Sequence, residues 1–277
     1  DATVNGGGHA VAIADQVGKR GKVIGIDLDP GIIEKLKEQN ARERRNNLSL
    51  VRDNYINLRK ILSERGYDKV NGVLFDLGFS SYHLEQSSRG FSFLRDEPLD
   101  MRYDPLRNDL TAEKIIQAWS REAIENILLL YGEERYARRI AERIIAERTR
   151  NKINTSAELA RIVCDSVPPV SVSQKMSRKI HPATRTFQAI RMAVNDELAN
   201  LEGALREAID VLLPNGIMIV ISFHSLEDRA VKRFLQAREK EDILKIITKK
   251  PLKPSREEIQ HNRRSRSAKL RAASRVS

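Results

Sequence analysis

The sequence contains a single cysteine, Cys164, among its 277 residues. One cysteine excludes a disulfide within the chain and a thiolate cluster for zinc. It suits a reducing compartment, so we expect a cytoplasmic protein. Cys164 lies in an apolar helical stretch, and we interpret it as a small buried side chain rather than a nucleophile. The five histidines are scattered without ligand spacing, which predicts no bound metal.

Aromatic residues make up only 5% of the chain, which argues against a broad stacking platform for RNA bases. No apolar run reaches the roughly 18 residues that a membrane helix needs. With 40% hydrophobic and 31% charged residues, the composition is typical of a soluble globular protein. The length allows a main domain and a second module. The first residue is Asp1, which falls inside a predicted motif, so we expect that further residues precede it.

Positive charge is in excess and is unevenly distributed. The net charge is +11 and the isoelectric point is about 9.8, which favours a polyanionic partner. Residues 245–277 hold eleven Lys and Arg against two Glu. Such a block is often only a solvated tail. Strand-like apolar pieces interrupt it here, so we expect it to be folded and to contact phosphates.

Short apolar runs alternate with helical patterns at both ends of the chain. This alternation predicts an α/β fold with a parallel, doubly wound sheet. The expected strands are 1–5, 23–27, 48–51, 70–76 and 217–223, and an antiparallel pair, 243–248 and 267–273, closes the chain. The middle reads as helical throughout, with expected helices at 111–119, 121–130, 133–148, 156–167 and 185–194. We therefore predict a main domain of residues 1–103 and 191–277 that is interrupted by a helical domain of residues 104–190.

Three features stand at the carboxyl ends of predicted strands, where open α/β sheets bind ligands. They are the turn Gly6-Gly7-Gly8-His9, the carboxylate of Asp27 and the carboxylate of Asp76. The glycines let a ligand approach the backbone, and Asp27 suits the hydroxyls of a ribose. Each feature alone is weak, but together they indicate a nucleoside-bearing cofactor. The contiguous glycines lack the G-x-G-x-x-G spacing of dinucleotide sites, which favours S-adenosylmethionine over NAD.

Several longer motifs resemble the MraW/RsmH family. The resemblance runs nearly from end to end and is carried by Gly7–His9, Ile26–Pro30, Phe75–Ser81, Arg89–Phe93, Pro98–Arg102, Tyr131–Arg135, His181–Arg191, Ile221–Arg229 and Arg264–Arg271. Members of this family methylate N4 of a cytidine in the decoding region of small-subunit (16S) ribosomal RNA. The resemblance implies a class I, Rossmann-like methyltransferase sheet with an inserted helical domain for substrate recognition. It also implies the 30S subunit or its RNA as partner; a homodimer is possible.

The resemblance also implies the cofactor contacts. They would come from Gly7, Gly8, His9, Asp27, Tyr55 and Asp76, with Tyr55 near the adenine. Two positions depart from the family pattern. Asn5 stands where glycine is common, and His83 stands where a glutamine commonly contacts the cofactor. A histidine still donates one hydrogen bond, so we retain His83 among the predicted cofactor contacts.

Methyl transfer to the exocyclic amine of cytosine needs a hydrogen-bond acceptor that localises the nitrogen lone pair and takes the proton. Asp100 is the first candidate and Asp76 the alternative. Asp100 has two structural alternatives, because it could pair with Arg102 or cap the next helix. For the substrate, Phe91 and Phe93 could stack on the flipped base, or could pack in the core. Arg102, Arg185, Arg191 and His224 complete the predicted substrate contacts, with Arg178, Lys179 and the 245–277 block on phosphates.

Two other functions compete with this interpretation. One is a protein with a methyltransferase-like fold that only binds RNA or ribosomes. The other is an NAD-type oxidoreductase. The intact set of Gly7, Gly8, His9, Asp27 and Asp76 argues against the first, and the glycine spacing argues against the second.

Overall fold

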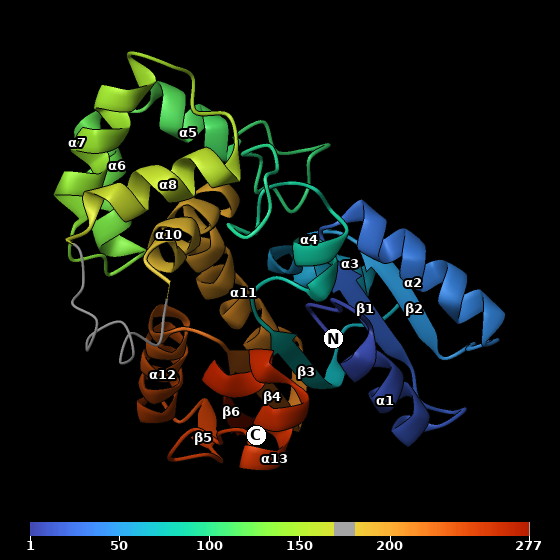
Figure 1. Ribbon diagram of the computed structural model, residues 1–277. Coiled ribbons are helices and arrows are strands. Elements are labelled where there is room, and N and C mark those ends of the chain that lie inside the picture. The colour runs from blue at the N-terminus through green and yellow to red at the C-terminus, as the bar shows by residue number, and fades with distance from the viewer. Residues whose placement is uncertain (169–180, 277) are drawn as a thin grey trace. The chain divides into compact units, whose positions relative to one another are not determined.

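The computed structural model describes residues 1–168 and 181–276 (Figure 1). They form two compact units: unit 1 is Asp1–Ser80 with Leu198–Ser277, and unit 2 is Ser81–Glu197. Unit 2 thus interrupts unit 1 in the chain, but the division falls at other residues than the predicted 103/104 and 190/191. Hydrogen bonds give the reason, since Tyr103 N–H donates to the Asn195 side chain and Asn195 donates to the Met101 carbonyl. These bonds hold the segment before residue 104 to the helical unit.

Unit 1 alternates strands and helices. Its elements are α1 (Gly8–Val17), β1 (Val23–Asp27), α2 (Pro30–Arg42), β2 (Leu48–Arg52), η1 (Tyr55–Asn57), α3 (Leu58–Ser63), β3 (Val70–Asp76), α11 (Glu197–Val211), β4 (Leu212–Ser222), α12 (Ser225–Lys240), β5 (Leu244–Ile246), α13 (Arg256–His261), η2 (Arg263–Ser267) and β6 (Lys269–Arg275). Glu197, the first residue of α11, belongs to unit 2. The predicted antiparallel pair at the end of the chain is confirmed as β5 and β6.

The strands pair in two hydrogen-bonded groups. β1 pairs with β2 in parallel, while the second group has the order β3-β4-β6-β5, with β3 and β4 parallel and β6 antiparallel to both neighbours. Residues 1–4 connect the groups, because Val4 N–H donates to the Ile26 carbonyl in β1 and Ala2 N–H donates to the Leu74 carbonyl in β3. β1 thus lies on one side of residues 1–4, and β3 lies on the other side. In open α/β sheets, ligands bind beyond the carboxyl ends of the strands at such a switch point.

The core of unit 1 packs α3, α11 and α12 against the sheet. Phe75, Ile26 and Met218 come from the strands, and Leu201 and Leu205 come from one face of α11; all are almost completely buried. The predicted strand 217–223 begins earlier in the structure, at Leu212, and is interrupted. Its register against β3 shifts between Val70 and Gly72, where Asn215 adopts a left-handed φ of 63°. Residues 214–216 therefore lie in a bulge within β4.

The described residues of unit 2 form helices joined by loops, with a long loop between α4 and α5. Its helices are α4 (Ser81–Glu85), α5 (Ala112–Ala118), α6 (Arg121–Leu130), α7 (Ala137–Arg148), α8 (Ser156–Ser166) and α10 (Ala183–Asn195). They enclose a core of Ile115, Ile124, Leu128 and Ile140. The helix predicted from residue 133 begins only at Ala137, because Glu133 has a φ of 46° and breaks the helical path. Among the described helices of both units, none has the length and apolarity that crossing a membrane requires.

Candidate active site

The glycine turn leads from the segment 1–4 into α1. Asn5 and Gly7 both have left-handed backbones, with φ of 47° and 83°. Asparagine tolerates this conformation better than most residues, so Asn5 fits a turn at which the family resemblance had implied a glycine. A Cβ atom on Gly7 would lie 2.7 Å from Leu36 Cδ2, whereas a Cβ atom on Gly6 or Gly8 would meet nothing within 4 Å. The exposed side of the turn is therefore open space bordered by backbone and by the first N–H groups of α1.

Asp27 ties this turn to β1. Its Oδ2 accepts the Asn5 N–H at 2.9 Å, and its Oδ1 accepts the Asp29 N–H at 2.9 Å. Asp29 is buried and caps α2, where it accepts the Gly31 N–H at 2.8 Å. Burial raises the pKa of Asp27 to about 7, although the hydrogen bonds from Asp29 and Asn5 oppose the rise. A carboxylate accepts about four hydrogen bonds, so acceptor capacity remains for a ligand.

Asp76 ends β3 on the other side of the switch point. The Asn5 amide donates to the Asp76 backbone carbonyl at 2.8 Å, which brings the turn and the end of β3 together. His9 Nε2 lies 3.7 Å from Asp76 Oδ2, and the His9 side chain is half exposed. Burial raises the pKa of Asp76; His9 and the Asn5 side chain oppose this rise and Glu227 adds to it. A carboxylate with a raised pKa at a strand end is suited to hold a proton or a ligand.

Tyr55 follows β2 at the same edge of the sheet. Asn54 caps the short η1 helix by accepting the Ile56 N–H at 3.0 Å, which fixes the start of the turn that carries Tyr55. The half-buried Tyr55 ring stands edge-on to Phe75 in β3, with centroids 5.9 Å apart. Unit 1 thus brings Gly7, Gly8, His9, Asp27, Tyr55 and Asp76 to the carboxyl edge of one sheet. Sequence patterns missed Asn54 and Asp29, although an Asp before Pro30 is a recognisable helix-capping signal.

Alanine substitutions at Gly7 and at Gly8 are expected to have opposite effects on stability. Gly7→Ala is expected to lower the melting temperature, because it forces a left-handed alanine against Leu36. Gly8→Ala is expected to leave stability unchanged or slightly raised, because the site is open and helical. Its methyl group would nevertheless enter the space beside the turn and weaken cofactor binding. Differential scanning fluorimetry with calorimetry checks both; full cofactor affinity in Gly8→Ala would place the ligand elsewhere.

Comparison with known proteins decides the family. The chain matches the MraW methylase family over residues 1–276. It belongs to that family. It is 42% identical over 291 residues to "Ribosomal RNA small subunit methyltransferase H" of Clostridium botulinum (strain Kyoto / Type A2), covering 100% of this chain and 92% of the relative. It is 45% identical over 276 residues to the protein of that name from Sulfurihydrogenibium sp. (strain YO3AOP1), again covering 100% and 92%.

The family match confirms the resemblance predicted from the motifs, and the structure confirms an α/β chain interrupted by a helical unit. In this MraW-family chain, His224 follows β4 and caps α12. Its Nδ1 accepts the Glu227 N–H at 3.4 Å, and its Nε2 lies 3.0 Å from Glu227 Oε1. Both ring nitrogens thus face the capping partner. The predicted base contact of His224 remains a prediction, and it would have to use the face or edge of the ring.

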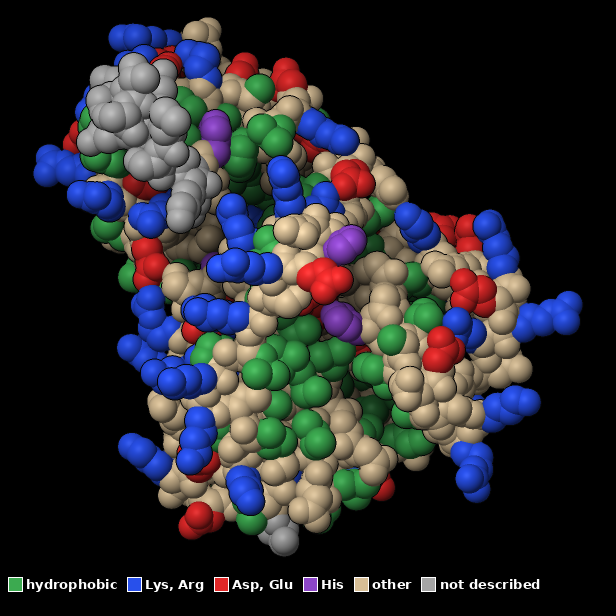
Figure 2. Space-filling view, turned by 60° about the horizontal axis from the view of Figure 1, so that its bottom comes forward, with side chains coloured by type: hydrophobic (Ala, Val, Ile, Leu, Met, Phe, Trp, Pro, Cys, Tyr) green, Lys and Arg blue, Asp and Glu red, His purple; other side chains and the backbone are tan. Residues whose placement is uncertain are grey.

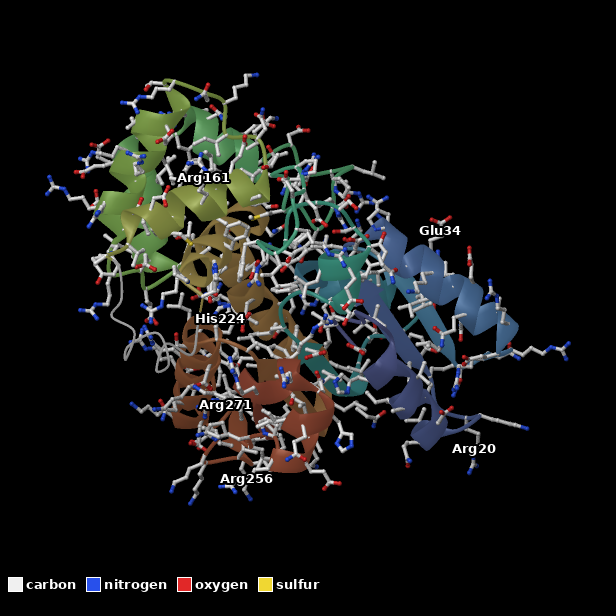
Figure 3. All side chains as sticks on the ribbon, in the orientation of Figure 1. Arg20, Glu34, Arg161, His224, Arg256 and Arg271 are labelled. Carbon is white, nitrogen blue, oxygen red and sulfur yellow. The ribbon has the colours of Figure 1, made fainter. Side chains whose placement is uncertain are left out.

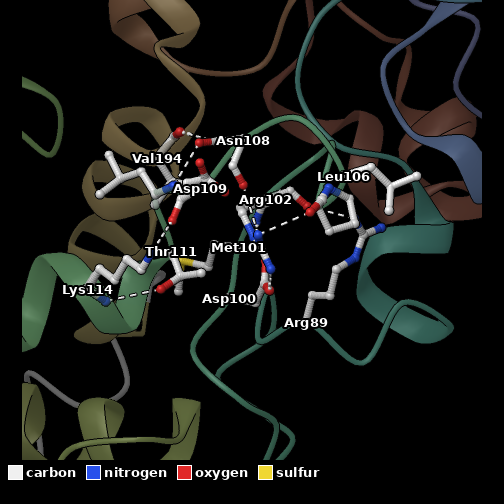
Figure 4. Close-up of polar contacts among 12 residues, drawn as sticks. Arg89, Asp100, Met101, Arg102, Leu106, Asn108, Asp109, Thr111, Lys114 and Val194 are labelled. Carbon is white, nitrogen blue, oxygen red and sulfur yellow. Dashed lines mark hydrogen bonds and ion pairs between the residues drawn. The ribbon is translucent and has the colours of Figure 1, made fainter.

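Asp100 lies in unit 2 and forms a forked ion pair with Arg102 (Figure 4). Arg102 Nε donates to Asp100 Oδ1 at 2.9 Å, and Arg102 Nη2 donates to Asp100 Oδ2 at 2.6 Å. Arg102 also donates to the Asn108 carbonyl at 2.8 Å. Of the options left open by the sequence, pairing with Arg102 is therefore what the structure shows. Both carboxylate oxygens of Asp100 already accept charged hydrogen bonds, and Arg102 has its own partners within the unit.

The predicted aromatic contacts pack within the helical unit of this MraW-family protein. Phe91 is buried and stacks on Tyr103, with centroids 5.6 Å apart and planes 11° from parallel. His83 is also buried, with its ring centroid 4.9 Å from that of Phe91. Phe93 is half-buried and stacks on His181 at 4.5 Å. Core packing thus accounts for Phe91, while a base contact of Phe93 and a cofactor contact of His83 stay predictions.

The predicted cationic contacts differ in availability. Arg191 is buried and donates two hydrogen bonds to Glu197, at 2.7 and 2.9 Å. Arg185 is exposed on α10 and donates to the Glu133 carbonyl at 2.8 Å. Arg178 and Lys179 lie outside the described residues. Of these arginines, Arg185 is the better placed to reach an external phosphate.

The C-terminal basic block divides into structural and exposed side chains. Lys269 and Arg271 both donate to Asp228, and Arg275 donates to the carbonyls of Ile209 and Leu212. The exposed members are Lys245, Lys249, Lys250, Lys253, Arg256, Arg263, Arg264 and Arg266. Figure 2 shows Lys and Arg side chains projecting from the visible surface more often than acidic ones. The block is therefore folded where described, with most of its charge facing outward.

Proposed function

We propose that this chain transfers a methyl group from S-adenosylmethionine to N4 of a cytidine in small-subunit ribosomal RNA, near the decoding site. The observation that carries the proposal is the arrangement at the switch point. A glycine turn, Asp27 and Asp76 meet at the carboxyl edge of one sheet in a member of a methylase family. The names of the relatives support ribosomal RNA of the small subunit as substrate.

The residues at this edge fit a nucleoside with a charged amino-acid tail. The open side of Gly6 and Gly8 accepts a ligand against the backbone, and the N-terminus of α1 favours a carboxylate. Asp27 keeps acceptor capacity for ribose hydroxyls, and Tyr55 offers a half-buried ring for an adenine. S-adenosylmethionine supplies a methyl group on a positively charged sulfur. The chain has to hold and orient the two reactants, which can remove a large part of the barrier.

The exocyclic amine of cytosine is a poor nucleophile because its lone pair is shared with the ring. We assign the role of hydrogen-bond and proton acceptor to Asp76 ahead of Asp100. His9 Nε2 lies 3.7 Å from Asp76 Oδ2, which is too far for a hydrogen bond. Both Asp100 oxygens, in contrast, already accept short hydrogen bonds from Arg102. Burial also raises the pKa of Asp76, which increases the proton affinity of this carboxylate. As the C–N bond to the methyl group forms, the bond from that carbon to the cofactor sulfur breaks and S-adenosylhomocysteine is left. Asp76 would accept an N–H of the amine and take its proton in this step.

The test is nucleoside mass spectrometry of ribosomal RNA from cells with and without this protein. We expect N4-methylated cytidine to decrease in the deletion strain and to return with the wild-type gene, but not with an Asp27→Ala variant. Unchanged methylation in the deletion strain would overturn the proposal. A protein that only binds ribosomes would restore no methylation and would show no S-adenosylmethionine binding in calorimetry, and tight NAD binding would indicate an oxidoreductase.

A further inference from the structure

A basic hollow lies in unit 1, between α12 and the strands β5 and β6. Its volume is about 240 Å³, and its lining includes Lys232, Glu239, Ile246, Thr248, Lys249 and Arg271. None of these residues belongs to the cofactor turn or to the ends of β1 and β3. The hollow is small, and three of its lining side chains are cationic.

Arg271 forms the buried part of this hollow, and Figure 3 shows it among α12, β5 and β6. It is only 7% exposed. Its Nε donates to Asp228 Oδ1 at 2.7 Å, while Lys269 occupies Asp228 Oδ2 at 2.8 Å. One carboxylate therefore serves two cations. None of the described residues accepts a hydrogen bond from Nη1 or Nη2 of Arg271, and these are the donors that suit the oxygens of a phosphate.

The rim of the hollow carries two further positive charges that are not paired with acidic side chains of the described residues. Lys232 on α12 and Lys249 after β5 are exposed, and the described part of the chain contains no ion pair to either. The one lining acid, Glu239, has its Oε1 on the Ile246 N–H at 2.9 Å. Thr248 Oγ1 accepts the Ala272 N–H at 2.9 Å, which fixes the loop that carries Lys249. Cations from three elements thus converge on one hollow, and lining cations outnumber lining acids.

The sheet register relates this hollow to the candidate active site. Asp76 in β3 pairs with Ile221 in β4, and the adjacent Val220 pairs with Arg271 in β6. Two strand spacings separate β3 from β6, which corresponds to about 10 Å between the backbones. Arg271, the buried side chain of the hollow, therefore belongs to the same sheet as Asp76 and lies two strands away from it.

We propose that this hollow binds a backbone phosphate of the substrate RNA, with Arg271 as the buried anchor and Lys232 and Lys249 at the rim. The proposal rests on the proposed function for the identity of the RNA. It assigns one phosphate to a defined position, whereas the exposed cations of the C-terminal block attract RNA without fixing its register.

The test substitutes the two rim lysines, Lys232 and Lys249, and leaves the buried Arg271 unchanged. We expect Lys232→Glu with Lys249→Glu to weaken binding of a fluorescent single-stranded RNA that spans the methylated site by at least tenfold, measured by anisotropy. The plot of log affinity against log salt has a negative slope, and its magnitude should decrease by about 0.7 for each phosphate contact that is lost. With undermethylated small subunits, KM for the subunit should rise while KM for S-adenosylmethionine stays constant.

The matched control is Lys19→Glu with Arg20→Glu, an equal charge change at exposed residues on the turn after α1, where Figure 3 labels Arg20. It should alter RNA affinity less than twofold. An equal loss of RNA affinity in both double variants would show that only the overall charge matters, and this would overturn the proposal. Unchanged RNA affinity in the rim variant would also overturn it. Inorganic phosphate that binds the wild type while the rim variant retains RNA affinity would instead indicate a small-anion site. If wild-type protein transfers no methyl group, the proposed function fails, but the binding measurements still decide whether the hollow holds an RNA phosphate.

Discussion

Asp27→Ala is expected to abolish cofactor binding, with the affinity for S-adenosylhomocysteine falling by at least about 100-fold. The Asp27 carboxylate holds the N–H groups of Asn5 and Asp29 and is the group at the end of β1 that suits ribose hydroxyls. Losing two charge-assisted hydrogen bonds to a ligand costs about 3–6 kcal/mol, which corresponds to a loss of more than 100-fold. Isothermal titration calorimetry measures the change directly.

Two controls separate a lost contact from a lost fold. Asp15→Ala removes an exposed carboxylate that pairs with Arg45, and it should leave cofactor affinity within twofold. Asp27→Asn keeps the shape of the side chain, and its melting temperature shows whether the turn persists. Cofactor affinity within tenfold of the wild type in Asp27→Ala would remove Asp27 from the binding site.

Asp27 also predicts a pH dependence. With a pKa near 7 in the ligand-free protein, the carboxylate is mostly protonated at pH 6 and mostly ionised at pH 8. Ribose hydroxyls donate to the ionised form, so affinity should rise about tenfold between these values and level off above them. The sign for stability is opposite. The folded state binds this proton more tightly than the unfolded state, so the free energy of unfolding should decrease as pH rises from about 4 to about 7. Calorimetry and denaturant titrations over this range check both trends.

Asp76→Asn is expected to lower kcat by about 10²–10⁴-fold at saturating cofactor, the range typical of losing a general base. Asparagine retains the shape and one acceptor oxygen, but it cannot take the proton from the amine. Cofactor affinity should change much less, because Asp27 and the glycine turn remain. Single-turnover methyl transfer to undermethylated small subunits measures the chemical step apart from product release.

Asp100→Asn is the matched variant for this prediction. It breaks the forked ion pair with Arg102, so we expect a lower melting temperature and a smaller effect on kcat. The opposite result, a large loss of turnover in Asp100→Asn and none in Asp76→Asn, would return the role of proton acceptor to Asp100. Rescue of Asp100→Asn at lower temperature would identify its defect as one of stability.

The sequence predicted the strand ends well because their signals are local. An apolar run that ends in Asp27 or Asp76, and a glycine turn before a helix, can each be recognised within a few residues. Partnerships between distant residues left no such signal. Lys269 and Arg271 share Asp228 across 41 and 43 residues, so the sequence alone showed them only as members of a basic block. The burial of His83 was equally hidden, because the rings that surround it come from separate loops.

The position of residues 1–4 between β1 and β3 has a consequence for how the protein folds. This segment pairs with β1 on one side, and its other side is paired only when β3 has formed. In β3, the Asp76 N–H that donates to Thr3 Oγ1 lies 73 residues further along the chain than Thr3. Closing so long a loop is slow compared with forming the local βαβ pairings. During synthesis, the glycine turn would therefore make its contacts with β1 before its contacts with β3. Cofactor binding should begin only after β3 has left the ribosome. Cofactor bound at that moment would stabilise the junction between β1 and β3 before β4 and β6 join the sheet.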